Sequence, residues 1–305
     1  MNEVRVWAPA TVANVNVGFD GLGLALRAPG ERMVARKTDA DGVRIRAIHG
    51  APGLSLDAEA NVAGVAAQSL LQALGAPCGV ELEIHKDILP GSGIGSSAAS
   101  AAAAVVAVDA LLGAGLRPDE LLPFALDGEA LASGSRHADN VAPALMGGIV
   151  LCPPEGAPVA IPVPEGLHLT IVHPQVEIRT SEARKVLPTE VPLHLAVDQA
   201  RWFAAFVAAC YRNDSVGAAY ALEDLYIGPA RAPLLPCYPA VQAAAVQAGA
   251  RAGGISGSGP STFWATLDAE TATAVGESAA AILEEAGITA AIHITSIASQ
   301  GAHVL

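Results

Sequence analysis

The fold is decided at residues 89–99, which read Leu89-Pro90-Gly91-Ser92-Gly93-Ile94-Gly95-Ser96-Ser97-Ala98-Ala99. Residues 80–85 just before them alternate apolar and polar side chains, as a half-buried strand does, and residues 96–112 read as a helix of small residues. The glycines permit positive φ and leave backbone N–H groups unshielded. Together with the positive end of the helix, those groups predict a polyphosphate site, where Ser96 or Ser97 caps the helix and its hydroxyl reaches a phosphate-bound metal.

The sequence of this loop differs from those of two familiar phosphate-binding loops. A Walker A loop requires a lysine after its last glycine, and no lysine of this chain follows a glycine. A Rossmann fingerprint requires a glycine at position 96, where the chain has serine. Taken alone, the loop is also consistent with a tight turn ahead of a closely packed helix. A second loop reads Gly253-Gly254-Ile255-Ser256-Gly257-Ser258-Gly259-Pro260-Ser261, and one ligand held between two halves explains both loops best.

The composition narrows the classes of partner. The 305 residues are 52% hydrophobic and 15% charged, which is enough to bury a large core, and the net charge is −13. Nucleic-acid binding and polybasic membrane binding need basic patches, so both are excluded. The longest run of small apolar residues, 98–112, is interrupted by Ser100 and Asp109 and is too short to cross a bilayer. We expect a soluble, cytoplasmic protein in which each cation near a motif is informative.

A proline-rich segment at residues 152–166 marks the expected boundary between two domains, 1–155 and 156–305. Strands and helices alternate without the regular repeat of a doubly wound sheet, so the sequence predicts an α+β fold. The predicted helices cover residues 61–74, 96–112, 118–133, 197–211, 239–250 and 269–286. The predicted strands cover residues 4–8, 80–85, 167–173, 261–267 and 290–297.

The glycine loops resemble two motifs of the GHMP kinases, the family of galacto-, homoserine, mevalonate and phosphomevalonate kinases. The Asn-rich loop ahead of Phe19-Asp20 resembles the family's N-terminal motif, and the three motifs occur in family order across nearly the whole chain. The resemblance implies a two-domain architecture with an N-terminal domain of the ribosomal S5 type and a ferredoxin-like C-terminal domain. It also implies that ATP is bound by Pro90, Gly91, Ser92, Gly93, Ile94, Gly95, Ser96 and Ser97. Pro90 directly precedes Gly91, whereas the family usually has a residue between them.

Residues 11–20 resemble the T-x-A-N-L-G-x-G-F-D motif of the homoserine kinase branch. In that branch the residues that match Asn14 and Asp20 hold the amino acid. Asp20 would pair with the α-ammonium group, while Asn14 would bond the hydroxyl or the carboxylate. Asn16 replaces the motif's glycine, and asparagine tolerates a left-handed conformation. Without the resemblance, Asp20 is equally a turn residue before Gly21.

Three further segments resemble the same branch: residues 133–148, 180–188 and 229–236. The resemblance implies that His137 and Thr180 contact the substrate and that Arg184 and Arg231 bind its carboxylate, which planar guanidinium groups suit. Gly228 stands where an acidic residue is usual. Taken singly, the histidine is also consistent with a structural role and each arginine with a solvated surface charge.

The resemblance also assigns groups at the nucleotide. Glu129 matches the family glutamate that binds Mg²⁺ together with the loop serine, here Ser97, and oxygen ligands suit that ion. Asn61 and Lys86 match positions near the nucleotide. Their alternatives are a helix N-cap for Asn61 and a strand-end cation for Lys86.

The implied activity is the ATP-dependent phosphorylation of L-homoserine to O-phospho-L-homoserine, a step of threonine biosynthesis, and family habit implies a homodimer. The implied catalytic residues are Asn140, Ser97 and Glu129. Mevalonate kinases have an aspartate where this chain has Asn140, so we expect no dedicated carboxylate base, although Asp139 is an adjacent candidate. Two alternatives are the same fold acting on another alcohol, such as mevalonate or shikimate, and a non-catalytic nucleotide-binding relative.

Overall fold

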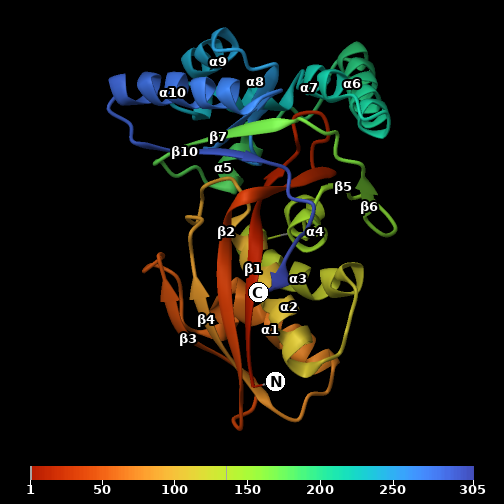
Figure 1. Cartoon of the computed structure of the whole chain (residues 1–305), viewed down its shortest axis with the longest axis vertical. Helices are drawn as coiled ribbons and strands as arrows, with labels where there is room; N and C mark the ends of the chain where they lie inside the picture. Colours follow the sequence, from red (N-terminus) through yellow and green to blue (C-terminus); the bar gives the residue numbers. More distant parts are fainter. Residues whose placement is uncertain (1, 135) are drawn as a thin grey trace.

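Two β-sheets organise the computed structural model, which describes residues 2–134 and 136–305 (Figure 1). In the first sheet the order is β11-β1-β2-β4-β3, and β5 joins β2 to β6. Its strands are β1 (Glu3–Ala13), β2 (Leu22–Thr38), β3 (Val43–His49), β4 (Gly79–His85), β5 (Ile149–Leu151), β6 (Val159–Ile161) and β11 (His303–Val304). The second sheet has the order β10-β7-β9-β8, with β7 (His168–Pro174), β8 (Ala252–Ile255), β9 (Thr262–Thr266) and β10 (Ala290–Ser296). The predicted α+β class is confirmed.

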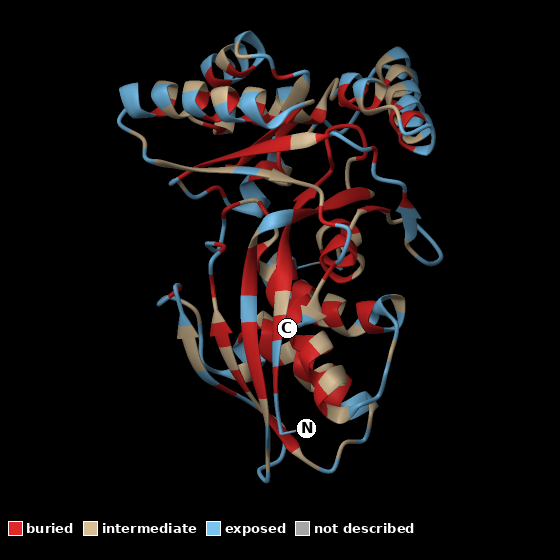
Figure 2. Cartoon of the chain, in the orientation of Figure 1, coloured by how far each residue is buried: buried red, intermediate tan, exposed pale blue. Residues whose placement is uncertain are grey.

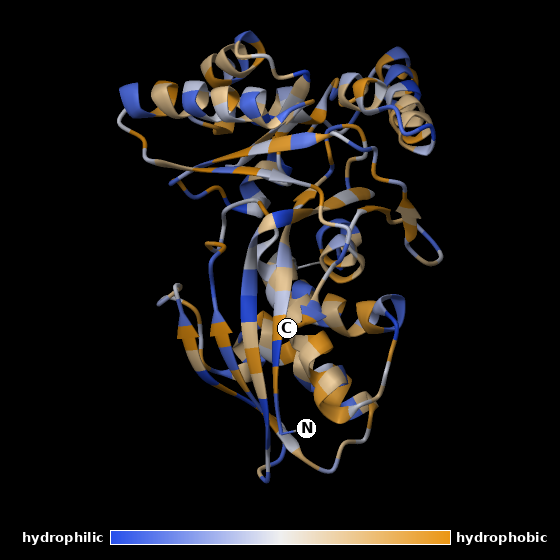
Figure 3. Cartoon of the chain, viewed as in Figure 1, coloured by the Kyte–Doolittle hydropathy of each residue, from blue (hydrophilic) through white to orange (hydrophobic). Residues whose placement is uncertain are grey.

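Helices α1 (Val62–Ala73), α2 (Ser96–Leu112) and α4 (Ala138–Met146) contact the first sheet, and α3 (Pro118–Ser133) packs against all three of them. Helix α2 contacts β1 and β2 as well as the other three helices, and most of its residues are buried. A helix that is apolar on every side belongs in a core, and small side chains let its neighbours approach closely. Figures 2 and 3 show buried, hydrophobic residues concentrated where these helices meet the strands.

The remaining helices belong to the second half of the chain. They are α5 (Thr180–Lys185), α6 (Leu193–Tyr211), α7 (Ser215–Tyr220), α8 (Ile227–Arg231), α9 (Tyr238–Gln247) and α10 (Ala269–Glu285), with 3₁₀ turns η1 (Ala58–Ala60) before α1 and η2 (Ala232–Leu234) after α8. Helix α10 packs on β7, β9 and β10, and α9 packs against α10. The two therefore cover the second sheet on one side (Figure 1).

Most predicted elements are confirmed, and two of the predicted helices coincide with α2 and α3. One expectation was wrong. Residues 253–255 are not loop but belong to β8, where they pair with β9 in antiparallel register. Glycine does not prevent strand pairing, and the aromatic side chain of Trp264 lies directly over Gly253.

The division into domains 1–155 and 156–305 stays a prediction, but the chain crosses between the sheets more than once. Strand β6 lies inside the proline-rich segment and pairs with β5 of the first sheet. The C-terminal strand β11 returns to pair with β1. Within the described residues, no helix is both long enough and apolar enough to span a membrane.

Candidate active site

A cleft of about 630 Å³ lies between the two sheets and is lined by residues of both halves. Almost every predicted site residue lines it: Asn14, Asp20, Asn61, Lys86, Pro90, Gly91, Ser92, Gly93, Gly95, Ser96, Ser97, Glu129, His137, Asn140, Thr180, Arg184 and Arg231. The exception is Ile94, whose side chain is buried in the hydrophobic core. Ser135, inside one of the quoted segments, lies outside the described residues.

Residues of the first glycine loop line this cleft. Gly93 and Gly95 have φ values of 80° and 72°, and Gly95 is the N-cap of α2. A Cβ atom on Gly95 would lie 1.9 Å from Oγ1 of Thr11, so glycine is required here for space as well as for φ. The N–H groups of Gly93, Gly95 and Ser97 have no acceptor among the described residues. With the N-terminus of α2 they form the anion cradle that the sequence predicts.

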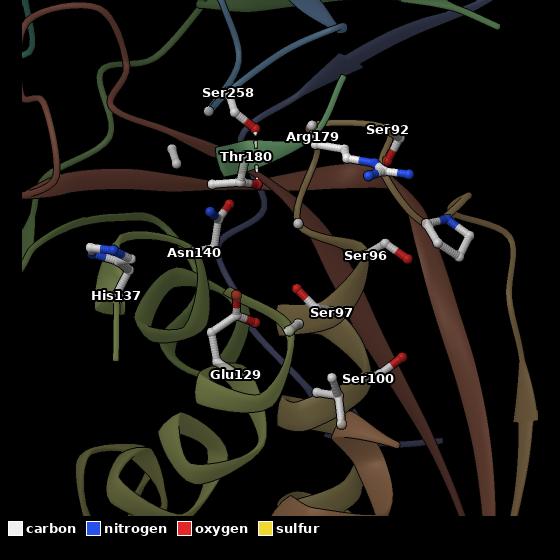
Figure 4. A pocket seen from close by; sticks show the side chains of 18 of the residues that line it. Ser92, Ser96, Ser97, Ser100, Glu129, His137, Asn140, Arg179, Thr180 and Ser258 are labelled. Atoms are coloured by element: carbon white, nitrogen blue, oxygen red, sulfur yellow. Dashed lines mark hydrogen bonds between the residues drawn. The ribbon is translucent and has the colours of Figure 1, made fainter. Parts of the chain in front are cut away.

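The two serines that open α2 point in different directions. Neither caps the helix, so that expectation was wrong. The Ser96 hydroxyl donates to the carbonyl of Ile88 at 2.9 Å and turns toward the buried Glu31. Ser97 turns toward Glu129 across the gap between α2 and α3 (Figure 4). A hydroxyl and a carboxylate on one cleft wall are hard oxygen ligands, which fit Mg²⁺.

The second glycine loop holds the first one in place. The Ser256 hydroxyl donates to the carbonyl of Gly93 at 2.7 Å, and the Ser261 hydroxyl donates to that of Ser92 at 2.5 Å. A Cβ atom on Gly93 would lie 2.5 Å from the carbonyl oxygen of Gly259. The two loops therefore touch, and the second loop donates hydrogen bonds to carbonyls of the first while the amides of Gly93 and Gly95 stay unpaired among the described residues.

Lys86 lies beneath the first loop in an ion pair with Glu31, and both side chains are almost fully buried. Its ammonium group also donates to the carbonyl of Ser96 at 3.0 Å and to Oγ of Ser100 at 2.9 Å. All three N–H donors are thus engaged. Burial lowers the pKa of Lys86 and raises that of Glu31, against their mutual attraction. The lysine anchors the start of α2 in this structure, and a direct contact to the nucleotide stays a prediction.

Arg184 and Asp20 form a second ion pair in the lining of the cleft. Two guanidinium nitrogens of Arg184 donate to the two carboxylate oxygens at 2.9 and 3.1 Å. Nη2 of Arg184 is also 2.9 Å from Nε2 of His137. Burial, followed by the arginine charge, lowers the pKa of His137, which favours the neutral ring that accepts this bond. The three residues come from distant parts of the chain, as the motifs predict.

Arg231 is far more enclosed, with 3% of its surface exposed. Its Nη1 donates to the carbonyl of Gly257 at 2.7 Å and its Nε to that of Ala183 at 3.2 Å. The ring of Phe19 lies 5.2 Å from the Arg231 guanidinium carbon and 5.9 Å from that of Arg184. Phe19 therefore lies against both cations, a contact that the sequence motif does not reveal.

The Asn-rich loop is a run of left-handed residues. Asn14, Val15 and Asn16 have φ values of 67°, 45° and 58°, and such a value is strained for the β-branched valine. Asn16 thus adopts the conformation expected of a glycine replacement, and its amide donates to the carbonyls of Leu222 and Gly253. Asn14 donates to the carbonyl of Gly257 and accepts the amide of Asp20 at 2.9 Å. The run joins the two halves at the cleft.

Helix α4 contributes two adjacent polar residues. Oδ1 of Asn140 accepts the hydroxyl of the buried Thr11 at 2.7 Å. Asp139 is 4% exposed, and burial, reinforced by the charge of Asp20, raises the pKa of its carboxyl to about 7. Sequence reasoning did not include Thr11 among the site residues, because only the fold brings it to Asn140.

Two predicted residues have local roles that the structure makes plain. Asn61 is the N-cap of α1, where its side chain accepts the amide of Ala63 at 3.0 Å, and it also lines the cleft. Thr180, at the start of α5, lies with its hydroxyl 3.4 Å from that of Ser258 in the second loop (Figure 4). Sequence reasoning missed Ser258 and Arg179, although both line the cleft. Ser258 belongs to the second glycine-loop motif, which could have identified it, whereas no motif of the sequence includes Arg179.

Comparison with known proteins agrees with these motifs. A family model, GHMP kinases N terminal domain, matches residues 61–148. The chain is 43% identical to the homoserine kinase of Xylella fastidiosa (strain M12) over all of this chain and 94% of that one. It is 40% identical to the homoserine kinase of Chlorobium phaeobacteroides (strain DSM 266 / SMG 266 / 2430) over the full length of both.

The chain belongs to the homoserine kinases of the GHMP kinase family. A crystal structure of homoserine kinase from Cytophaga hutchinsonii ATCC 33406 superposes with a TM-score of 0.96 at 41% identity, covering 100% of this chain and 98% of that one. The two-domain kinase architecture that the resemblance implies is thus confirmed at the level of the fold, and this kinase acts on ATP.

Proposed function

We propose that this kinase transfers the γ-phosphoryl group of ATP to the side-chain hydroxyl of L-homoserine, giving O-phospho-L-homoserine for threonine biosynthesis. Membership in the homoserine kinases supports the reaction. The observation that carries the acceptor class is the Arg184–Asp20 pair on the cleft wall. An α-amino acid brings a carboxylate and an ammonium group, and this pair offers one charge of each complementary sign.

The part of the cleft beside the first glycine loop, where the nucleotide would bind, contains few cations. Phosphoryl transfer requires mainly positioning and neutralisation of charge on the phosphates. The amides of Gly93, Gly95 and Ser97, unpaired among the described residues, supply partial positive charge there with the N-terminus of α2. Ser97 and Glu129 would hold Mg²⁺, which neutralises phosphate charge when bound. Asn61 and Pro90 border the same region of the cleft. This arrangement explains how a chain of net charge −13 handles a polyphosphate.

The residues around the Arg184–Asp20 pair would bind the amino acid and orient its side-chain hydroxyl. Asn14, His137, Thr180 and Arg231 would position the amino acid around the ion pair. Asn140 is neutral and already accepts a hydrogen bond from Thr11, so it takes no proton from the acceptor. The proton of the hydroxyl passes to the γ-phosphate or to water, and no carboxylate base is dedicated to it.

We extend the proposal to the setting of the enzyme, which works as a cytoplasmic homodimer with a nucleotide-binding domain at 1–155 and a second domain at 156–305. The family resemblance supports the dimer, the proline-rich segment supports the boundary, and the composition supports the location. Light scattering of the purified chain measures the mass, and a monomer at micromolar concentration would contradict the dimer.

An acceptor panel tests the function. L-homoserine is compared with 4-hydroxybutyrate, which lacks the ammonium group, with 3-aminopropan-1-ol, which lacks the carboxylate, and with mevalonate and shikimate. Because each trimmed analogue lacks one of the two charged groups that Arg184 and Asp20 would bind, we expect kcat/KM to fall by about 10²-fold for each of them. If the enzyme turned over mevalonate as fast as L-homoserine, the acceptor would be an alcohol other than homoserine. ATP binding without turnover of any acceptor would identify a non-catalytic relative.

A further inference from the structure

Two histidines and a glutamate gather on the outer face of the first sheet, away from the cleft. His49 is the last residue of β3, while Glu83 and His85 lie two residues apart on β4. The parallel register of the two strands pairs His49 with His85. Residues two apart on a strand share a face, so the three side chains project together. The alternate residues Leu82 and Ile84 are buried in the core, which leaves the cluster on the solvent side.

The nitrogen and oxygen atoms of this cluster already have the spacing of a metal site. Nε2 of His49 and Nε2 of His85 each lie 3.3 Å from the same oxygen, Oε1 of Glu83. Around a tetrahedral zinc ion, bonds of about 2.0–2.2 Å separate neighbouring ligand atoms by about 3.3–3.5 Å. The two distances therefore match two edges of the coordination tetrahedron.

Arg36 prepares the carboxylate for this role. Its Nη1 donates to Oε2 of Glu83 at 3.0 Å, which leaves Oε1 for the histidines. The ligating group is therefore an oriented carboxylate with a hydrogen-bond partner behind it, the arrangement that tunes ligands in protein metal sites.

We propose that His49, Glu83 and His85 form a surface site for a divalent transition-metal ion, with Zn²⁺ as the best fit. Two imidazoles and one carboxylate suit Zn²⁺, Ni²⁺ or Cu²⁺ and do not suit Mg²⁺, which prefers oxygen ligands. A water molecule completes the fourth position. The site links β3 to β4, and among the described strands β3 pairs only with β4 at the edge of the sheet (Figure 1).

Binding requires one local movement. The two imidazole rings are stacked, with centroids 4.5 Å apart and an angle of 18° between their planes, so their lone pairs do not yet converge. The side chain of His49 is 53% exposed, which lets its ring turn without disturbing the core. Rotation about the broad χ2 torsion then directs both nitrogens at one ion. The ion in turn fixes the end of the edge strand.

Calorimetric titration of the full-length, metal-free kinase with ZnCl₂ tests the site. We expect a binding event that millimolar Mg²⁺ does not displace, and whose affinity falls at least about tenfold in His49→Gln and again in His85→Gln. His194→Gln is the matched control, because His194 is exposed on α6 and outside the cluster. Circular dichroism confirms that each variant is folded.

A thermal readout separates this site from zinc binding in the cleft. Because an ion bound only to the folded state raises Tm, Zn²⁺ should stabilise the unaltered chain and the His194→Gln control but not the His49→Gln/His85→Gln double variant. Zinc affinity and Tm shifts that are unchanged in the double variant would overturn the proposal, as would an unaltered chain that binds no Zn²⁺.

Discussion

The ion pairs Lys86–Glu31 and Arg184–Asp20 each join a cation of the cleft lining to a carboxylate, yet they differ in burial. The side chains of the first pair are 2% and 1% exposed, and those of the second are 37% and 34% exposed. Every N–H donor of Lys86 ends on a protein acceptor, whereas Arg184 retains N–H groups with no acceptor among the described residues. In this comparison the buried cation supports the fold, whereas the solvent-accessible one keeps N–H groups that a ligand can use.

The buried pair should show the largest effect, and the effect should be on stability. Lys86→Met leaves Glu31 without its cation in the core, so we expect the free energy of unfolding to fall by about 3–5 kcal/mol. Urea denaturation measures it. The double variant Lys86→Met/Glu31→Gln should recover much of this loss. Lys37→Met is the matched control, since Lys37 is exposed, and it should change stability by less than about 0.5 kcal/mol. If Lys86→Met unfolded with the same free energy as the unaltered chain, the buried pair would not support the fold.

Changing the exposed Arg184–Asp20 pair should lower activity and leave stability nearly unchanged. Arg184→Gln removes a bidentate partner for the carboxylate, so kcat/KM for L-homoserine should fall by about 10²–10³-fold while KM for ATP changes little. Because a solvent-accessible ion pair contributes little to stability, the free energy of unfolding should change by about 1 kcal/mol or less. Lys185→Gln, the adjacent exposed cation on α5, is the control and should behave like the unaltered enzyme. An equal rise in both KM values would contradict a role at the acceptor.

The sequence predicts the local parts of this picture and not the distant pairings. Helices α2 and α3 were predicted correctly because Gly113 and Pro118 separate two apolar patterns. The glycine loops were predicted because each motif is continuous. Glu31 could not be assigned to Lys86, because nothing local marks a strand residue as the partner of a lysine that the fold brings to it.

The protonation of Asp139 sharpens the comparison, because this carboxyl is buried like Glu31 but belongs to no ion pair among the described residues. Burial and then the charge of Asp20 raise its pKa to about 7. Its folded-state pKa exceeds its unfolded value near 4, so its contribution to stability is complete below about pH 4 and is lost as the pH rises through 7. Between pH 5 and pH 8 this loss should reach about 2–3 kcal/mol.

Asp139→Asn should lack this pH-dependent component, so urea denaturation at the two pH values should show a gain over the unaltered chain that is larger at pH 8. The same variant should retain the chemical step, since no carboxylate base is proposed. A rate lower by several orders of magnitude, with nucleotide binding intact, would instead assign the base to Asp139.

The smallest expected effect concerns Phe19, whose ring lies against both Arg184 and Arg231. A cation over an aromatic face at a partly exposed site contributes about 0.5–1 kcal/mol. Phe19→Leu keeps the apolar volume and removes the ring, so KM for L-homoserine should rise by about three- to fivefold with kcat nearly unchanged. Phe19→Tyr keeps the ring face and should restore the original KM. If leucine and tyrosine variants behaved alike, the ring would serve only to fill space, and Arg184 would be positioned by Asp20 and His137 without it.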